Sequence, residues 1–89
     1  MINRELNIIN KLGLHARAAA KFVTTAGGFS STIQISHNDL LVNGKSIMGV
    51  MMLAAGMGSR LTLQVEGEDE EAAAAALEVL VNDRFGEGE

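Results

Sequence analysis

The sequence contains no cysteine, and its only aromatic residues are three phenylalanines. Without cysteine the chain can form neither disulfides nor thiolate metal sites, which is consistent with a reducing compartment. The scarcity of aromatic rings leaves few side chains on which nucleic-acid bases could stack. The formal net charge of −4 also means that lysine and arginine are too few to neutralise many phosphates. We therefore expect no nucleic-acid partner.

Long hydrophobic runs are absent as well. No stretch approaches the roughly 20 apolar residues that a membrane-spanning helix requires. The first residues, Met1 to Glu5, lack the basic-then-apolar order of a secretory signal. We therefore expect a cytoplasmic protein without membrane insertion. Hydrophobic residues make up 47% of the 89 residues, which predicts one domain, residues 1–89, built around a single core.

Alternating and helical patterns follow one another along this domain. Alternation of apolar and polar residues predicts strands over residues 4–9, 32–36, 40–42 and 61–66. Helices are expected from Ala16 to the glycine pair Gly27-Gly28, over about 46–54, and from Asp69 onward. The order is βαββαβα, which favours an α+β open-faced two-layer sandwich, with a four-stranded antiparallel sheet and three helices on one face. Small regulatory domains of ferredoxin-like type share much of this order, so the order alone identifies no family.

The apolar spacing also predicts which helical residues are buried. Residues at intervals of three and four share one helix face. In the middle helix we expect Val50 and Leu53 to be buried, and residues 86–89 to form a frayed tail. The stripes predicted for the first and last helices are Ala16, Ala19, Ala20, Val23 and Ala26, and Ala73, Ala76, Leu77, Leu80 and Val81.

One stretch stands out chemically, because a loop with one glycine and one histidine leads directly into an alanine-rich helix. It places His15 and Arg17 at the start of that helix, where unpaired amides and the helix dipole attract anions. Imidazole is a nucleophile that is largely neutral near pH 7, and a guanidinium can hold phosphate oxygens. A histidine at this position can equally be a simple cap or a surface residue.

Two blocks of sequence carry a resemblance to a known family. Leu12-Gly13-Leu14-His15-Ala16-Arg17 is similar to the phosphorylation site of the histidine-containing phosphocarrier proteins (HPr) of the bacterial sugar phosphotransferase system. Asn43-Gly44-Lys45-Ser46-Ile47-Met48-Gly49-Val50-Met51 resembles the regulatory-serine segment of that family, at the family's separation from the histidine. One departure is Ala18, which stands where the family usually has proline, a residue favoured in a first helical turn.

This resemblance implies a carrier rather than a self-contained enzyme, with no cofactor. His15 would take a phosphoryl group on Nδ1 from phosphorylated Enzyme I and pass it to an enzyme II component of the IIA type, assisted by Arg17. Ser46 would be a regulatory site for HPr kinase/phosphorylase. The residues expected to contact partners are Leu14, Ala16, Ala20, Lys21, Ile47, Met48 and Met51.

Some questions stay open on the sequence alone. The chain could serve the nitrogen-related branch of the system, or act as a regulatory binding module that uses phosphorylation as its signal. We expect no metal site, because His15 and His37 are the only histidines and there is no cysteine. We also expect a monomer. We predict that His37 is a solvated surface residue.

Overall fold

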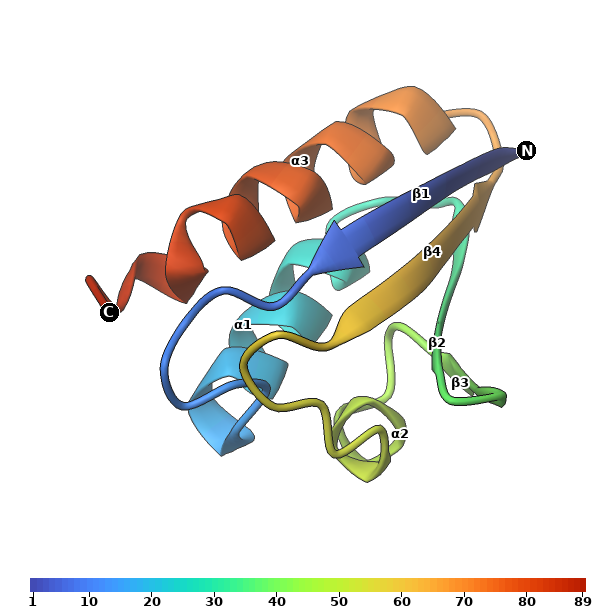
Figure 1. The fold of residues 1–89 in the computed structure, drawn as a ribbon. Helices are drawn as coiled ribbons and strands as arrows, with labels where there is room; N and C mark the ends of the chain where they lie inside the picture. Colours follow the sequence, from blue (N-terminus) through green and yellow to red (C-terminus); the bar gives the residue numbers. More distant parts are fainter.

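The computed structural model describes residues 1–89 and contains one antiparallel sheet of four strands (Figure 1). The strands lie in the order β1-β4-β2-β3. Antiparallel partners join β1 to β4, β4 to β2, and β2 to β3. Their bounds are Ile2–Asn7 for β1, Thr32–His37 for β2, Leu40–Asn43 for β3 and Arg60–Glu66 for β4.

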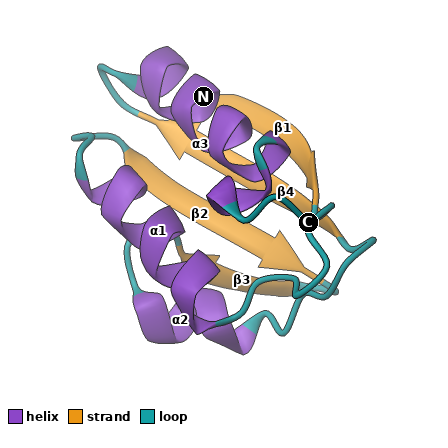
Figure 2. Cartoon of the chain, turned by 90° about the vertical axis from the view of Figure 1, so that its left-hand side faces the viewer, coloured by secondary structure: helices purple, strands orange, loops and turns teal.

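Three helices cover one face of this sheet, as Figure 2 shows, and the other face stays open. They are α1 (Ala16–Gly27), α2 (Ile47–Met52) and α3 (Glu70–Asn82). A short 3₁₀ turn, Arg84–Gly86, follows α3. This arrangement confirms the predicted α+β open-faced sandwich and its βαββαβα order. None of its helices combines the length and the apolar character needed to cross a bilayer.

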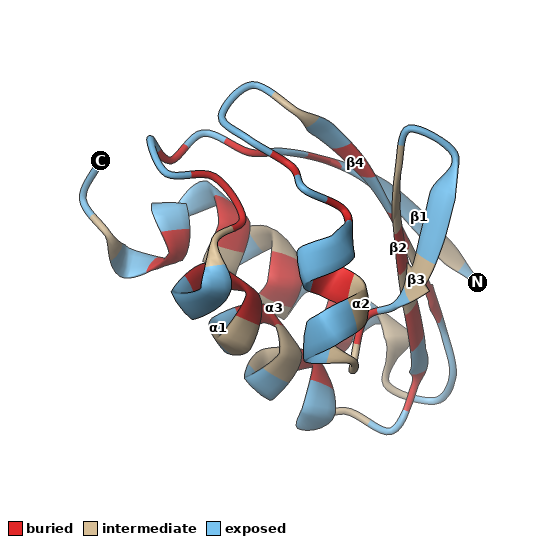
Figure 3. Cartoon of the chain, turned by 90° about the horizontal axis from the view of Figure 1, so that it is seen from below, coloured by how far each residue is buried: buried red, intermediate tan, exposed pale blue.

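The hydrophobic core lies between the sheet and the helices (Figure 3). The alternation in β4 leaves Leu61, Leu63 and Val65 at most 1% exposed, because successive side chains of a strand point to opposite faces. Phe22 of α1 and Phe85 of the 3₁₀ turn are the largest fully buried side chains. Burying a side chain of this size contributes about 1.5–3 kcal/mol each.

The buried face of α1 differs from the predicted stripe. Ala19 and Ala26 are buried as expected, but Ala16 is exposed and Ala20 and Val23 are only half-buried. The core residues of the helix are Ala18, Ala19, Phe22 and Ala26. Seven of the first eleven helical residues are apolar and five of these are alanine, so several faces fit the spacing. The one large ring, Phe22, determines which face packs on the sheet.

The predicted stripe of α3 is closer to the structure. Ala73, Leu77 and Val81 are buried as expected, whereas Ala76 and Leu80 are half-buried. Ala74 was not in the predicted stripe and is also buried. The face of α3 is therefore rotated slightly toward Ala74 from the one that the spacing suggested.

Two boundaries are also shifted from the prediction. Strand β1 ends at Asn7 rather than at residue 9, although Leu6 and Ile8 are both buried as the alternation implies. Ile8 lies just beyond the strand, where its amide donates to Ser59 O at 2.9 Å. The β2–β3 connection is the expected tight hairpin, with positive φ at Asn38 (49°) and Asp39 (68°), as two-residue turns of type I′ require.

The C-terminal segment contradicts the prediction of a frayed tail. After α3 the chain turns through left-handed conformations at Arg84 and Phe85, with φ of 54° and 53°. Phe85 is 1% exposed and anchors the turn in the core. The last residue then returns to the loop before α1, where Lys11 N donates to Glu89 O at 2.6 Å. The tail (residues 84–89) thus lies beside the start of α1.

Candidate functional site

His15 caps the N-terminus of α1. Its backbone is extended, with φ −74° and ψ 177°, and its Nδ1 accepts a hydrogen bond from Arg17 N at 3.3 Å. The amides of Ala16 and Ala18 donate no hydrogen bond within the chain. Unpaired amides of a first helical turn attract anions, and the helix dipole adds to that attraction. The ring nitrogen closest to the helix therefore faces a group of polarised N–H bonds.

The loop before His15 is held by close backbone contacts. Gly13 has φ +68°, and a Cβ at this position would lie 2.6 Å from Ala55 O and 2.7 Å from Gly56 Cα. Only glycine fits this conformation without strain. The next residue is fixed by the bond from Leu14 N to Ala55 O at 2.8 Å. Leu14, which is expected from the sequence to contact partners, is only 6% exposed and belongs to the core, so it offers little surface for such a contact.

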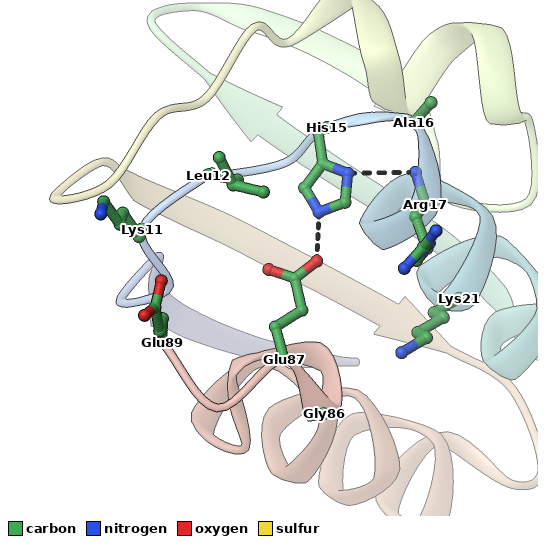
Figure 4. A pocket seen from close by; sticks show the side chains of 9 residues that line it. All are labelled: Lys11, Leu12, His15, Ala16, Arg17, Lys21, Gly86, Glu87 and Glu89. Carbon is green, nitrogen blue, oxygen red and sulfur yellow. Dashed lines mark hydrogen bonds and ion pairs between the residues drawn. The ribbon is translucent and has the colours of Figure 1, made fainter.

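The other side of the imidazole faces the tail. Nε2 of His15 pairs with Oε2 of Glu87, as Figure 4 shows. The second carboxylate oxygen, Oε1, accepts from Nδ2 of buried Asn10 at 2.9 Å. The hydrogen bond with His15 is the main cause that lowers the pKa of Glu87; Asn10 and the charges of His15 and Lys21 add to it, and burial opposes it. Glu87 is therefore ionised at neutral pH.

These two contacts together specify the tautomer of His15. Nδ1 accepts a hydrogen bond from the Arg17 amide, so it carries no proton, and a neutral imidazole then has its proton on the other nitrogen. Nε2–H then donates to the Glu87 carboxylate, which can only accept. The lone pair of Nδ1 consequently points at the helix start. Sequence reasoning found His15 but missed Glu87, because no spacing rule connects residues 72 positions apart. It also missed Asn10, whose partner Glu87 lies 77 positions away.

A pocket of about 700 Å³ opens between α1, the loop before it and the tail (Figure 4). Three cationic side chains and two carboxylates line it. The Arg17 guanidinium has no hydrogen-bonding or ion-pair partner in the chain, whereas Nζ of Lys21 donates to Phe85 O at 2.5 Å. His15 itself keeps 28% of its side chain exposed at this pocket. The lining residues are Lys11, Leu12, His15, Ala16, Arg17, Lys21, Gly86, Glu87 and Glu89.

Ser46 lies at the N-terminus of the second helix. Its Oγ accepts from Gly49 N at 3.2 Å, so it is the cap of α2 that the sequence predicts for a serine at this position. The side chain is half-buried. Its hydroxyl therefore has a structural role in addition to any regulatory one.

Helix α2 is largely exposed, as its pale blue ribbon in Figure 3 shows, and its exposed side chains include four large apolar ones. We call Ile47, Met48, Met51 and Met52 the α2 patch; their side chains are between 41% and 74% exposed. Val50 and Leu53 face the core, as predicted. Of the α1 residues expected to extend a contact surface, Ala16 and Lys21 are exposed and Ala20 is half-buried. Helix α1 packs against α2, so these residues and the α2 patch lie on neighbouring elements.

His37 departs from the prediction of a solvated residue. It is half-buried, and its Nδ1 hydrogen-bonds to Leu53 O at 2.9 Å, which ties the end of β2 to the end of α2. No group of three or more histidine or carboxylate side chains comes together where a metal ion could bind.

The chain is similar to known proteins in both sequence and fold. Residues 2–83 match the family described as "PTS HPr component phosphorylation site". The "Phosphocarrier protein HPr" of Cupriavidus necator is 57% identical over 89 residues and covers all of both chains. That of Pseudomonas aeruginosa is 58% identical over 86 residues, 96% of each chain. The crystal structure of HPr from Thermoanaerobacter tengcongensis superposes with a TM-score of 0.94 at 48% identity, over 98% of each chain.

Proposed function

The chain belongs to the HPr family of phosphotransferase-system phosphocarriers, and on this premise we propose that Nδ1 of His15 is the atom that carries the phosphoryl group. The donor is phosphorylated Enzyme I and the acceptor is an enzyme IIA component. The observation that carries the proposal is the cap geometry: Nδ1 lies at the start of α1 and accepts from Arg17 N. The site is a relay between two proteins, working as a cytoplasmic monomer.

The chemistry requires positioning and charge stabilisation more than a deep cleft. The Nδ1 lone pair attacks phosphorus, the bond from phosphorus to the donor breaks, and the donor keeps that electron pair. The phosphoryl oxygens then lie near the unpaired amides of Ala16 and Ala18. The free guanidinium of Arg17 can turn toward the same oxygens, because no other group in the chain holds it.

The partners are proposed to dock on the α2 patch and on the exposed α1 residues Ala16 and Lys21. Large exposed apolar areas are typical of contact surfaces, and methionine side chains adapt to several partner shapes. Ser46 caps the same helix. A phosphate on it would add negative charge beside the α2 patch, so we propose that its modification by HPr kinase/phosphorylase weakens docking to Enzyme I.

Phosphorylation by Enzyme I tests the proposal directly. The protein is incubated with labelled phosphoenolpyruvate and Enzyme I of either the sugar or the nitrogen-related branch. We expect one acid-labile, base-stable phosphate on the wild type and none on His15→Ala. The matched control is His37→Gln, which changes the only other histidine and is expected to accept phosphate normally. Labelling of His15→Ala, or loss of labelling in His37→Gln alone, would refute His15 as the carrier.

The choice of Enzyme I also separates the two branches. Faster labelling by the sugar-branch enzyme supports the function proposed above, whereas faster labelling by the nitrogen-related enzyme assigns the chain to the other branch. Labelling by neither would favour a regulatory binding module that shares the fold.

A further inference from the structure

The tail is fastened around His15 at several points. Phe85 is buried, its carbonyl accepts from Lys21 at 2.5 Å, and Glu89 O accepts from Lys11 N at 2.6 Å. Glu87 lies between these fixed points. Its side chain is only 15% exposed although it lies two residues before the last residue, Glu89. The position of its carboxylate is therefore set by the folded tail on both sides.

Each oxygen of that carboxylate has its own partner. Oε1 accepts from Asn10 Nδ2, and Oε2 pairs with His15 Nε2. Asn10 is itself fully buried, and the same amide nitrogen donates to Gly13 O at 2.8 Å. A buried asparagine thus connects the loop before His15 with the tail. Asn10 thus holds the Glu87 carboxylate in place, and the carboxylate in turn orients the imidazole. Catalytic histidines are commonly oriented by a third group in this way.

We propose that Glu87 is a positioning residue for phosphoryl transfer. It keeps the proton of His15 on Nε2, so that Nδ1 retains its lone pair. When Nδ1 forms the bond to phosphorus, the ring acquires a positive charge, and the proton on Nε2 stays where it is, hydrogen-bonded to the carboxylate. The negative charge of Glu87 stabilises this cation, and no proton has to leave or enter. The inference rests on the proposed function of His15.

The role belongs to the folded tail, which the family match does not cover. That match ends at residue 83, before the turn that carries Phe85 and Glu87. The chain also supplies a matched control in the same pocket. Glu89 lines the pocket, but its side chain makes no hydrogen bond or ion pair. Glu89→Gln therefore removes the same charge from the same tail without altering a contact to His15.

The experiment compares Glu87→Gln, Glu87→Ala and Glu89→Gln with the wild type. Steady-state transfer from phospho-Enzyme I gives kcat and KM, and ¹⁵N NMR of the unphosphorylated proteins gives the protonation of the two ring nitrogens. We expect both Glu87 variants to lose about tenfold in kcat with KM unchanged, because one charge-assisted hydrogen bond to the reacting ring is lost. In Glu87→Ala the ¹⁵N shift of Nε2 should also move. Glu89→Gln should match the wild type in both measurements.

Other outcomes overturn the proposal in distinguishable ways. Wild-type kcat in both Glu87 variants, or an equal loss in Glu89→Gln, would show that Glu87 has no specific role. A rise in KM alone would place Glu87 in docking instead. If the wild type accepted no phosphate at all, the proposed function would fail. The ¹⁵N shifts would then still determine whether Glu87 sets the tautomer, and unchanged shifts in Glu87→Ala would refute that too.

Discussion

Three glycines near the candidate site allow two costs of substitution to be measured separately: steric overlap with the neighbouring backbone, and strain of a left-handed backbone conformation. Gly13 has a positive φ and no room for a Cβ, since Ala55 O would lie 2.6 Å away. Gly58 also has a positive φ, of 92°, but nothing lies within 4 Å of its Cβ position. Gly56 has neither constraint. Alanine substitutions at the three positions therefore separate steric overlap from backbone strain.

The expected magnitudes follow from these environments. Gly56→Ala should be neutral or stabilising by up to about 1 kcal/mol, because alanine restricts the unfolded chain. Gly58→Ala should cost about 1 kcal/mol, the left-handed penalty of roughly 1–2 kcal/mol less that gain. Gly13→Ala carries the same net conformational cost of about 1 kcal/mol and a further ~1–3 kcal/mol of overpacking against backbone, for a total of about 2–4 kcal/mol.

Urea denaturation of the three variants and the wild type measures the free energies of unfolding, with m-values checked for equality. Gly13→Ala should also slow phosphate acceptance. The loop must shift away from Ala55 O to relieve the overlap, which disturbs the hydrogen bond from Leu14 N to that oxygen and displaces the adjacent His15. A difference of less than about 0.5 kcal/mol between Gly13→Ala and Gly58→Ala would refute the packing argument, since ordinary surface substitutions vary by that much.

Three further predictions concern the helix starts. Ala18→Pro should stabilise the fold by about 0.4–1 kcal/mol in urea denaturation, because the Ala18 amide donates no hydrogen bond; a loss of stability would mean that the ring does not fit. The pKa of Asp69 is lowered to about 2, chiefly by the Ser31 hydroxyl and the Ser30 amide. Its stabilisation is present above its ordinary pKa of 3.8 and is lost as pH falls toward 2, so the urea midpoints of wild type and Asp69→Asn should converge over that range. Ser46→Asp should slow labelling by Enzyme I; an unchanged rate would contradict the proposed regulation.

The local elements of the fold could be predicted because their signals are local. Strand β4 alternates strictly, and its inward residues Leu61, Leu63 and Val65 are the buried ones. The face of α1 was harder to predict, since alanines are spread around that helix and only Phe22 has the volume to dominate its packing. Asp69 shows another limit: it opens α3 as expected, yet its carboxylate accepts from Ser30 and Ser31 rather than from the helix amides.

In the candidate site, too, the features set by neighbouring residues could be predicted from the sequence, and those set by distant residues could not. The position of His15 at a helix start depends on the residues next to it, so it can be predicted from the motif. The folded tail cannot, because Glu87 is 72 residues from His15 and two of its neighbours are glycines. Phe85 is the only local hint: a large apolar residue just after a helix favours a chain that returns to the core.

The choice between the two nitrogens of His15 therefore depends on the tertiary structure. The amide of Arg17 favours an unprotonated Nδ1, but in a partly exposed ring this single bond of 3.3 Å is weak. The carboxylate of Glu87 acts on the opposite nitrogen and favours the same tautomer. Because the two contacts come from opposite ends of the chain, a protein that keeps α1 intact but loses the tail contact should still present an imidazole at the helix start. It should do so with a less well-defined nucleophile, and for that reason we expect the loss of Glu87 to lower kcat without unfolding the protein.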